Sequence, residues 1–348
     1  MRKRNRAAIV LVLLALALIG AVLLACALGA VSIPPLDIIK MTLNKIHFAN
    51  FQATWQPADE TIIFQIRLIR VIGAALVGAA LATAGVLFQG LLRNPMADPY
   101  ITGTSGGAAL GATIAMMLPL GLAFSGLGLI PIAAFCGALA TILLVYNLAK
   151  VGSKTPIVSM LLAGFVVSSM LIAVMSLLIM TNGELQLKLH SVFSFLMGSI
   201  SVQYWSQIAI IAPLIIGGII IARFFAFHLN AFSLGEEQAA YLGINVEREK
   251  ISMLALGSLL TACAVSLSGL IGFVGLVMPH AVRLVLGPDH RLLIPASALA
   301  GATFLVVTDT LARTVLAPTE LPVGILTALI GAPFFIYLLR RTRREYAF

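Results

Sequence analysis

The sequence has very little charge for its length. Only 10% of its 348 residues are charged, whereas 60% are hydrophobic and 7% are aromatic. Soluble domains carry about 25% charged residues, so this composition excludes an ordinary soluble protein. It also excludes an intrinsically disordered chain, because disorder requires low hydrophobicity. We therefore predict an all-α membrane protein in which runs of about 20 apolar residues form the spans.

Residues that carry chemistry are also scarce. The three cysteines, Cys26, Cys136 and Cys263, lie in apolar stretches and lack metal-ligand spacing, which excludes a disulfide framework or a zinc site. H-E-x-x-H does not occur, which argues against metal-dependent intramembrane hydrolysis. There is no Gly-Lys pair, so the chain has no P-loop for ATP. We expect no metal, no cofactor and no enzymatic activity of its own.

No acidic residue is predicted in the middle of a span. A proton-coupled carrier usually keeps an ionisable relay at membrane depth, so this scarcity disfavours an ion-coupled secondary transporter. A sodium site made of backbone carbonyls would leave no such trace, and that alternative stays open. His280, next to Pro279, is the one candidate for buried chemistry, although a structural hydrogen-bonding role is the more common one for such a histidine.

Charge-free runs predict ten crossings in a single transmembrane domain over residues 1–348. An outside segment occupies 31–60 and a polar segment 228–250, and the eighth span is expected to be short or broken. Spans two to five and seven to ten are predicted to form an inverted repeat, in which Pro279 stands in the place of Pro95. The spans lie at about 8–30, 62–92, two within 99–149, 156–180, 191–221, two within 251–282, 292–310 and 321–340.

The cations are sorted by position along the chain. Four of the first six residues are Lys or Arg, and Arg340, Arg341, Arg343 and Arg344 lie near the end. Positive residues favour the cytoplasmic side, so both termini are predicted to be cytoplasmic; the family resemblance described below implies a bacterial or archaeal cell membrane. A cleaved signal peptide is the alternative, but the apolar run after Arg6 is longer than the usual 7–15 residues.

The segment 233–250 has the features of a partner-docking surface. Gly235 and Gly243 bracket a short run of good helix formers that starts with acidic residues such as Glu236, as a helix N-terminus favours. Leu234, Ala239 and Leu242 are predicted to give this helix an apolar stripe for a partner. An ordinary solvated loop helix is the alternative.

A second informative region follows span two. Pro95 and Pro99 end the helix and expose irregular backbone, which is tolerated at membrane depth only inside protein or along a cavity. Gly103, Gly107 and Gly111 then recur every four residues. Such a stripe lets helices approach closely, and its residues alone leave helix packing and a pathway element equally open.

Arginines predicted on the outer side require an explanation, because topology disfavours them there. Arg67 and Arg70 begin span two at i, i+3 and therefore share a helix face, while Arg313 lies near the outer turn between spans nine and ten. A docking surface for an acidic extracellular protein would account for them. Snorkelling toward lipid headgroups is the alternative.

Several motifs together resemble the FecCD-type permeases of ABC importers, and the likeness covers nearly the whole chain. The family carries ferric siderophores, haem and vitamin B12 (cobalamin). The matching motifs are Arg67-Leu-Ile-Arg70, Arg93-Asn-Pro-Met-Ala-Asp-Pro99 with Gly103-Thr-Ser-Gly106, Gly272-Phe-Val-Gly-Leu-Val-Met-Pro-His280, Glu320-Leu-Pro-Val-Gly324 and Gly331-Ala-Pro333.

The resemblance implies a type II importer fold and a set of roles. The docking arginines correspond to Arg67, Arg70 and Arg313, and the cytoplasmic gate to Asn94, Pro95 and Met96 with a second constriction at Ile157 and Val158. Ile157 and Val158 depart from the small hydroxyl residues that relatives often carry. Coupling to the ATPase corresponds to Gly235, Glu236, Ala239, Leu242 and Gly243.

The same resemblance implies partners. These are two ATPase subunits, a periplasmic or lipid-anchored substrate-binding protein, and a second permease copy or a close paralogue. The expected cargo is a ferric siderophore, with haem or cobalamin as alternatives. Nucleic acid is not an expected partner, because the net charge of +9 is accounted for by membrane topology.

Overall fold

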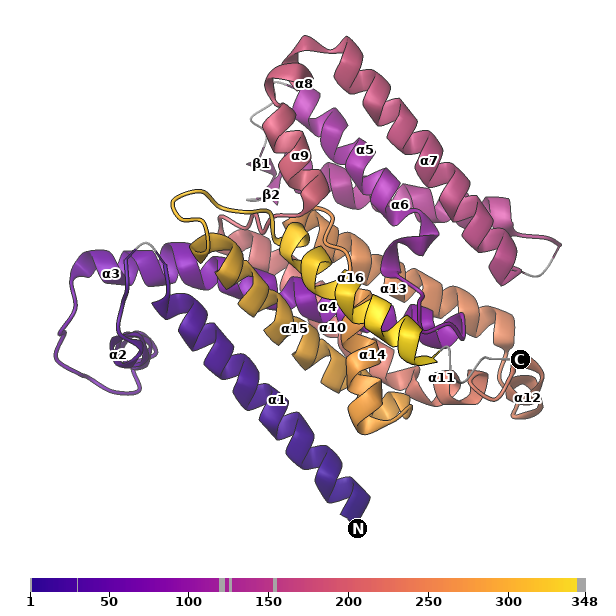
Figure 1. Ribbon diagram of the computed structural model, residues 1–348, viewed down its shortest axis with the longest axis horizontal. Helices are drawn as coiled ribbons and strands as arrows, with labels where there is room; N and C mark the ends of the chain where they lie inside the picture. The colour runs from indigo at the N-terminus through magenta and orange to yellow at the C-terminus, as the bar shows by residue number, and fades with distance from the viewer. Residues whose placement is uncertain (1, 30, 119–122, 125–126, 153–154, 343–348) are drawn as a thin grey trace.

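The computed structural model describes residues 2–29, 31–118, 123–124, 127–152 and 155–342. Arg343 and Arg344, two of the predicted cytoplasmic cations, lie outside these residues. The described chain is mostly helical, with loops between the helices and one antiparallel pair of two-residue strands, β1 (Ala123–Phe124) and β2 (Leu127–Gly128). Figure 1 shows the long helices gathered around α4 and α13, with α5 to α9 forming a lobe on one side.

The helices confirm the all-α prediction and follow the predicted spans closely. Seven are long and apolar enough to cross a membrane, within the described residues, and shorter apolar helices accompany them. The elements are α1 (Arg2–Ala27), α2 (Pro35–Lys45), α3 (Pro57–Thr61), the π-helix η1 (Ile62–Arg67), α4 (Leu68–Leu91), the 3-10 helix η2 (Pro99–Thr102), α5 (Thr104–Met117), α6 (Leu129–Ala149), α7 (Ile157–Thr181), α8 (Gly183–Leu187), α9 (Leu189–Met197), α10 (Trp205–Phe224), α11 (Ala226–Phe232), α12 (Glu236–Tyr241), α13 (Val246–Ser268), α14 (Val274–Leu286), α15 (His290–Thr314) and α16 (Val323–Thr342).

The core is centred on α4, which is the most buried of the long helices. Glycines let its neighbours come close: a Cβ at Gly78 would collide with the Gly301 backbone of α15, and a Cβ at Gly85 with the Gly275 backbone of α14. Small residues at helix contacts are the usual means of packing in membranes, where no hydrophobic force drives helices together. The lobe of α5 to α9 packs its helices in the same way, because Gly107 of α5 lies against α6.

The contacts support the predicted internal repeat. Helix α4 of the first half packs on α14 and α15 of the second half. In the same way, α13 of the second half packs on α5 and α6 of the first half. The two short helices α5 and α14 also begin alike, since Gly103 and Phe273 before them are both left-handed. The proposed match of Pro279 with Pro95 is wrong, because Pro279 lies inside α14 whereas Pro95 lies in the loop after α4.

Span six is not one helix from 191 to 221. The chain leaves α9 at Gly198, which has a positive φ of 74°, and α10 starts only at Trp205. The backbone between them pairs with the end of α13, because the N–H groups of Ser199 and Ser201 donate to Ser268 and Leu267 at 2.8 and 3.1 Å. These bonds satisfy backbone groups that a break at membrane depth would otherwise leave unpaired.

Candidate functional site: an arginine cluster, two helix breaks and a coupling segment

The three predicted docking arginines meet at the end of the bundle where α1 stops. Arg67, the last residue of η1, is only 6% exposed. Its Nη1 donates to the carbonyls of Cys26 and Ala27 at 2.7 and 3.2 Å, and its Nη2 donates to Val31. Carbonyls at a helix C-terminus lack intrahelical partners and attract cations. Arg67 therefore holds the C-terminus of α1.

An acidic residue of α15 joins the other two arginines. Asp309 of α15 is 1% exposed. Its Oδ1 accepts from Arg70 at 3.0 Å, and its Oδ2 accepts from Arg313 at 3.1 Å. Arg70 also pairs at 2.7 Å with Glu320, whose side chain is 54% exposed. We name Arg67, Arg70, Arg313, Asp309 and Glu320 the arginine cluster.

The cluster changes how the docking prediction must be understood. The three arginines do lie together, as predicted, but Asp309 and the end of α1 already occupy their guanidinium groups. Arg67 and the Arg313 side chain, which is 9% exposed, are internal. Only the Arg70–Glu320 pair reaches the surface. Internal pairing thus accounts for arginines at an end where the topology disfavours them. Asp309 was the residue in the sequence that could have predicted this pairing.

The irregular backbone after α4 is tied to the break before α14. The Tyr100 hydroxyl of η2 accepts from the Ile271 N–H at 3.1 Å and lies 3.3 Å from the Ile271 carbonyl. Near the end of α4, Gln89 Nε2 donates to the Gly275 carbonyl at 3.2 Å, and Arg283 Nη2 donates to Gln89 Oε1 at 2.9 Å. Hydrogen bonds therefore join the two halves of the repeat at their helix breaks.

Asp98 opens the 3-10 turn at this place. Its Oδ1 accepts from the Tyr100 N–H at 2.8 Å. Burial raises the pKa of the Asp98 carboxyl to about 6, and the hydrogen bond from Tyr100 only partly opposes this rise. A carboxylate in this position is costly for the folded state above that pH. The loop therefore carries a group that titrates close to neutrality.

The glycine stripe in this region is explained by helix packing. Gly107 and Gly111 face Gly137 and Ala133 of α6, where a Cβ would meet backbone atoms. Gly103 supplies the left-handed residue that starts α5. The structural hydrogen bond expected of His280 is absent among the described residues, because neither ring nitrogen has a partner and the ring instead contacts Phe334 and Phe335.

The predicted gate residues lie at two places. Asn94, Pro95 and Met96 are exposed in the loop after α4, and Asn94 Oδ1 accepts from the Met96 N–H at 2.9 Å. Ile157 and Val158 begin α7, and Val158 is 76% exposed. They line a cavity of about 500 Å³ together with residues of the coupling segment, among them Glu236, Glu237, Ala240 and Lys250. The second predicted gate thus adjoins the segment 233–250, which we name the coupling segment.

The coupling segment folds as its glycines predicted. Gly235 and Gly243 have positive φ angles of 124° and 80° and bracket α12. Glu236 in its first turn pairs with Lys250 of α13 at 2.7 Å. This anchors the short helix to the long one that follows it.

The predicted apolar stripe needs a correction. Ala239 is fully buried within the chain, and its carbonyl accepts from the Ile244 N–H at 3.2 Å. It cannot face a partner, because α12 packs that side inward. The exposed apolar side chains are Leu234, Tyr241 and Leu242, at 68%, 90% and 59%. We name these three the coupling patch. The sequence analysis did not include Tyr241 in the apolar stripe.

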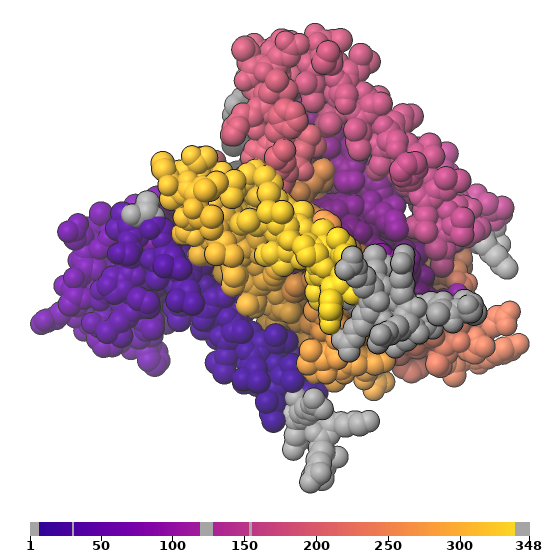
Figure 2. Space-filling model, viewed as in Figure 1, coloured from indigo at the N-terminus to yellow at the C-terminus, as the bar shows by residue number. Residues whose placement is uncertain are grey.

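The coupling patch and the arginine cluster lie at opposite ends of the bundle. Helix α4 carries Arg70 in its first turn and ends next to α11, which leads into α12. α15 runs the other way, from His290 beside Asn230 of α11 to Arg313 in the cluster. Figure 2 shows α16 crossing the face between the indigo N-terminal helices and the pink lobe. The arrangement suits a multi-pass membrane protein.

Comparison with known proteins identifies the family. The FecCD transport family matches residues 14–341. The chain is 47% identical to the cobalamin import system permease protein BtuC of Halobacterium salinarum, over 81% of this chain and 74% of that protein. It is 39% identical to the hemin transport system permease protein HmuU of Yersinia pestis, over 86% and 87%.

A solved structure described as an inward-facing metal-chelate type ABC transporter superposes with a TM-score of 0.80. It is 31% identical, and the match covers 95% of this chain and 98% of that one. The likeness thus extends over both ends of the bundle and over the helix breaks between them. The chain therefore belongs to the FecCD transport family of multi-pass ABC importer permeases.

Proposed function

We propose that this permease is a conduit without a motor of its own, moved by a separate ATPase that docks on the coupling patch. The observation that carries the proposal is the exposure of Leu234, Tyr241 and Leu242 on a helix bracketed by two glycines. Large apolar side chains gathered at one spot mark interaction sites. Two ATPase subunits would bind a permease dimer, made of two copies or of one copy and a paralogue.

A transport cycle follows from the position of the patch. The cavity that contains Ile157 and Val158 adjoins α12, so a push on α12 during ATP binding or hydrolysis is transmitted to the first turn of α7. We propose that this movement opens and closes the gate formed by Ile157 and Val158 with Asn94, Pro95 and Met96. The coupling end and both termini would then be cytoplasmic, in the cell membrane, as the distribution of Lys and Arg predicts.

Gly243 offers a test of the coupling step. Its φ of 80° is unfavourable for a side chain, although a Cβ there would meet no other atom. Gly243→Val is expected to shift α12 and to weaken ATPase co-purification and transport. Gly217→Val is a matched control, because a Cβ also meets nothing there and no positive φ is involved. Intact assembly and intact transport in Gly243→Val would contradict the coupling role.

We further propose that a substrate-binding protein docks at the opposite end, over the arginine cluster. Because Glu320 competes for Arg70, Glu320→Gln should leave Arg70 freer for an acidic partner and tighten binding several-fold. Glu60→Gln, on an exposed acid at the same end, is the control for general loss of negative charge. Unchanged affinity in Glu320→Gln together with unchanged transport would contradict docking through Arg70.

The proposed cargo is a metal chelate, with a ferric siderophore as the prediction from sequence. Cobalamin is the second candidate, and the 47% identity to a cobalamin permease favours it. Haem is a third, given the hemin permease. The test is ATP-dependent uptake by the reconstituted complex, offered ferric siderophores, haem and cobalamin in turn. Uptake of none of these chelates would contradict the proposed cargo class.

A further inference from the structure

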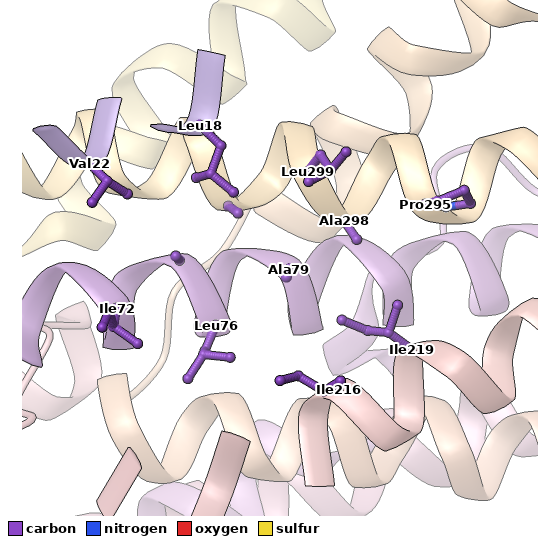
Figure 3. Close-up of a pocket in the computed structure, with 12 residues that line it drawn as sticks. Leu18, Val22, Ile72, Leu76, Ala79, Ile216, Ile219, Pro295, Ala298 and Leu299 are labelled. Carbon is purple, nitrogen blue, oxygen red and sulfur yellow. The ribbon is translucent and has the colours of Figure 1, made fainter. Parts of the chain in front are cut away.

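An apolar groove runs along the flank of the bundle between α1 and α10. The two helices form its walls and have no substantial contact with each other, whereas both approach α4 and α15. Leu18 and Val22 contribute one wall, and Ile216 and Ile219 the other, around a cavity of about 470 Å³ (Figure 3). Every residue that lines the groove is apolar.

The floor of the groove is hollow because its side chains are small. Ala75 and Ala79 of α4 and Ala298 and Ala302 of α15 lie at its base. A dry void deprives the surrounding atoms of dispersion contacts, and a lining without polar groups gives water no partners. Within a bilayer, the available filler is a hydrocarbon chain.

A second cavity, of about 970 Å³, lies where α1 begins. Apolar residues form part of its lining, but it also contains polar and charged side chains, and we name it the polar cavity. Arg223 and Arg291 line it together with Asn230 and Ser233. Neither guanidinium forms an ion pair within the part of the chain that the structure describes. The acid in this cavity, Asp289, is engaged, since its Oδ1 accepts from Asn230 Nδ2 at 2.8 Å and from the Arg291 N–H at 3.0 Å. Arg223 is therefore available to an anion, together with Arg291, whose guanidinium also attracts the Asp289 carboxylate.

Helical spacing joins the two cavities into one seam. On α10, Ile216 and Ile219 are followed by Arg223, at intervals of three and four residues that keep one helix face. On α15, Arg291 precedes Pro295 and Ala298 in the same way. On α1, Ala7 of the polar cavity is about three turns before Leu18 of the groove. The polar cavity therefore continues the groove toward the end of the bundle.

We propose that this seam binds an anionic phospholipid. Its phosphate lies between Arg223 and Arg291, and one acyl chain fills the groove between α1 and α10. Basic pockets between membrane helices are a recognised way of holding anionic headgroups. The proposal concerns a bound lipid and is independent of the cargo.

The test is native mass spectrometry of the full-length permease, titrated with phosphatidylglycerol or with phosphatidylcholine. We expect one phosphatidylglycerol per chain to bind roughly ten- to thirty-fold more tightly than phosphatidylcholine, as two nearby arginines predict. The double variant Arg223→Gln, Arg291→Gln should lose this preference, whereas Arg223→Lys, Arg291→Lys should keep most of it. Ala79→Leu, which fills the groove, should weaken both lipids alike.

Arg248→Gln is the matched control, since Arg248 is an exposed arginine at the same end of the bundle. Equal affinity for the two lipids, or an equal effect of Arg248→Gln and the double variant, would overturn the proposal. A second copy of the chain is the other possible occupant. Disulfide-linked dimers of an Ile216→Cys variant, in a Cys136→Ser background and in bilayers, would also overturn it.

Discussion

At the end of the bundle where α1 stops, three arginines are held inside the protein, whereas at the end where α12 lies, three large apolar side chains face outward. Charge is normally exposed and apolar surface buried, so both ends depart from expectation. At the first end the departure is satisfied internally, by Asp309 and by the carbonyls of α1. At the second end nothing in the described chain covers the side chains. The second end therefore presents an uncovered apolar surface, on which we propose that the ATPase docks.

The largest effect should come from charging the coupling patch. Tyr241→Asp with Leu242→Asp places two carboxylates where an apolar partner surface is expected, and loss of two central contacts of about 2 kcal/mol or more each weakens binding at least about 100-fold. The measurement is the affinity of the purified permease for its ATPase. Phe48→Asp, at an 80% exposed apolar residue of the opposite end, should bind normally. Equal affinities of the two variants for the ATPase would contradict the proposed difference between the two ends.

The arginine cluster should respond unequally at its two acids. Asp309→Asn leaves Arg70 and Arg313 buried without their shared counter-charge, at a cost of about 3–5 kcal/mol in unfolding free energy. Glu320→Gln removes an exposed partner and should cost within about 1 kcal/mol. Thermal or denaturant unfolding in detergent measures both. Similar losses for the two variants would show that Asp309 is not the centre of the cluster.

Removal of Arg67 should have a somewhat smaller effect. Arg67→Gln shortens the donor and leaves carbonyls at the end of α1 unpaired, which predicts a loss of about 2–3 kcal/mol and faster proteolysis after residue 27. Arg67→Lys should recover only part of this, since one ammonium cannot reach all three carbonyls. Limited proteolysis and unfolding report the two effects. A fully stable Arg67→Gln variant with weakened binding-protein affinity would instead favour a pure docking role.

The smallest predicted effect concerns Asp98 and depends on pH. Its folded pKa of about 6 exceeds the ordinary value near 3.9, so the folded state is penalised above about pH 6 and relieved as the pH falls toward 4. Asp98→Asn keeps the acceptor for Tyr100 and should stabilise the protein by about 1–3 kcal/mol at pH 7.5, with about half of that gain at pH 5. A pH-independent difference would contradict this origin.

Local features of the sequence predicted local structure well. Gly235 and Gly243 marked the ends of α12 correctly, because positive φ angles depend on the residue itself. The spans also followed from runs without charge. The break at Gly198 was missed, because it depends on hydrogen bonds to Ser268 and Leu267, far along the chain. The pairing of Arg70 with Asp309 and the inward orientation of Ala239 depend in the same way on tertiary packing.

The most direct test of the central claim is cargo uptake into liposomes that contain the permease. The account predicts no uptake by the permease alone, even under an imposed sodium or proton gradient. It predicts uptake once the ATPase, the binding protein and ATP are supplied, and none with the Tyr241→Asp, Leu242→Asp variant. Uptake by the permease alone, driven by an ion gradient, would contradict the account.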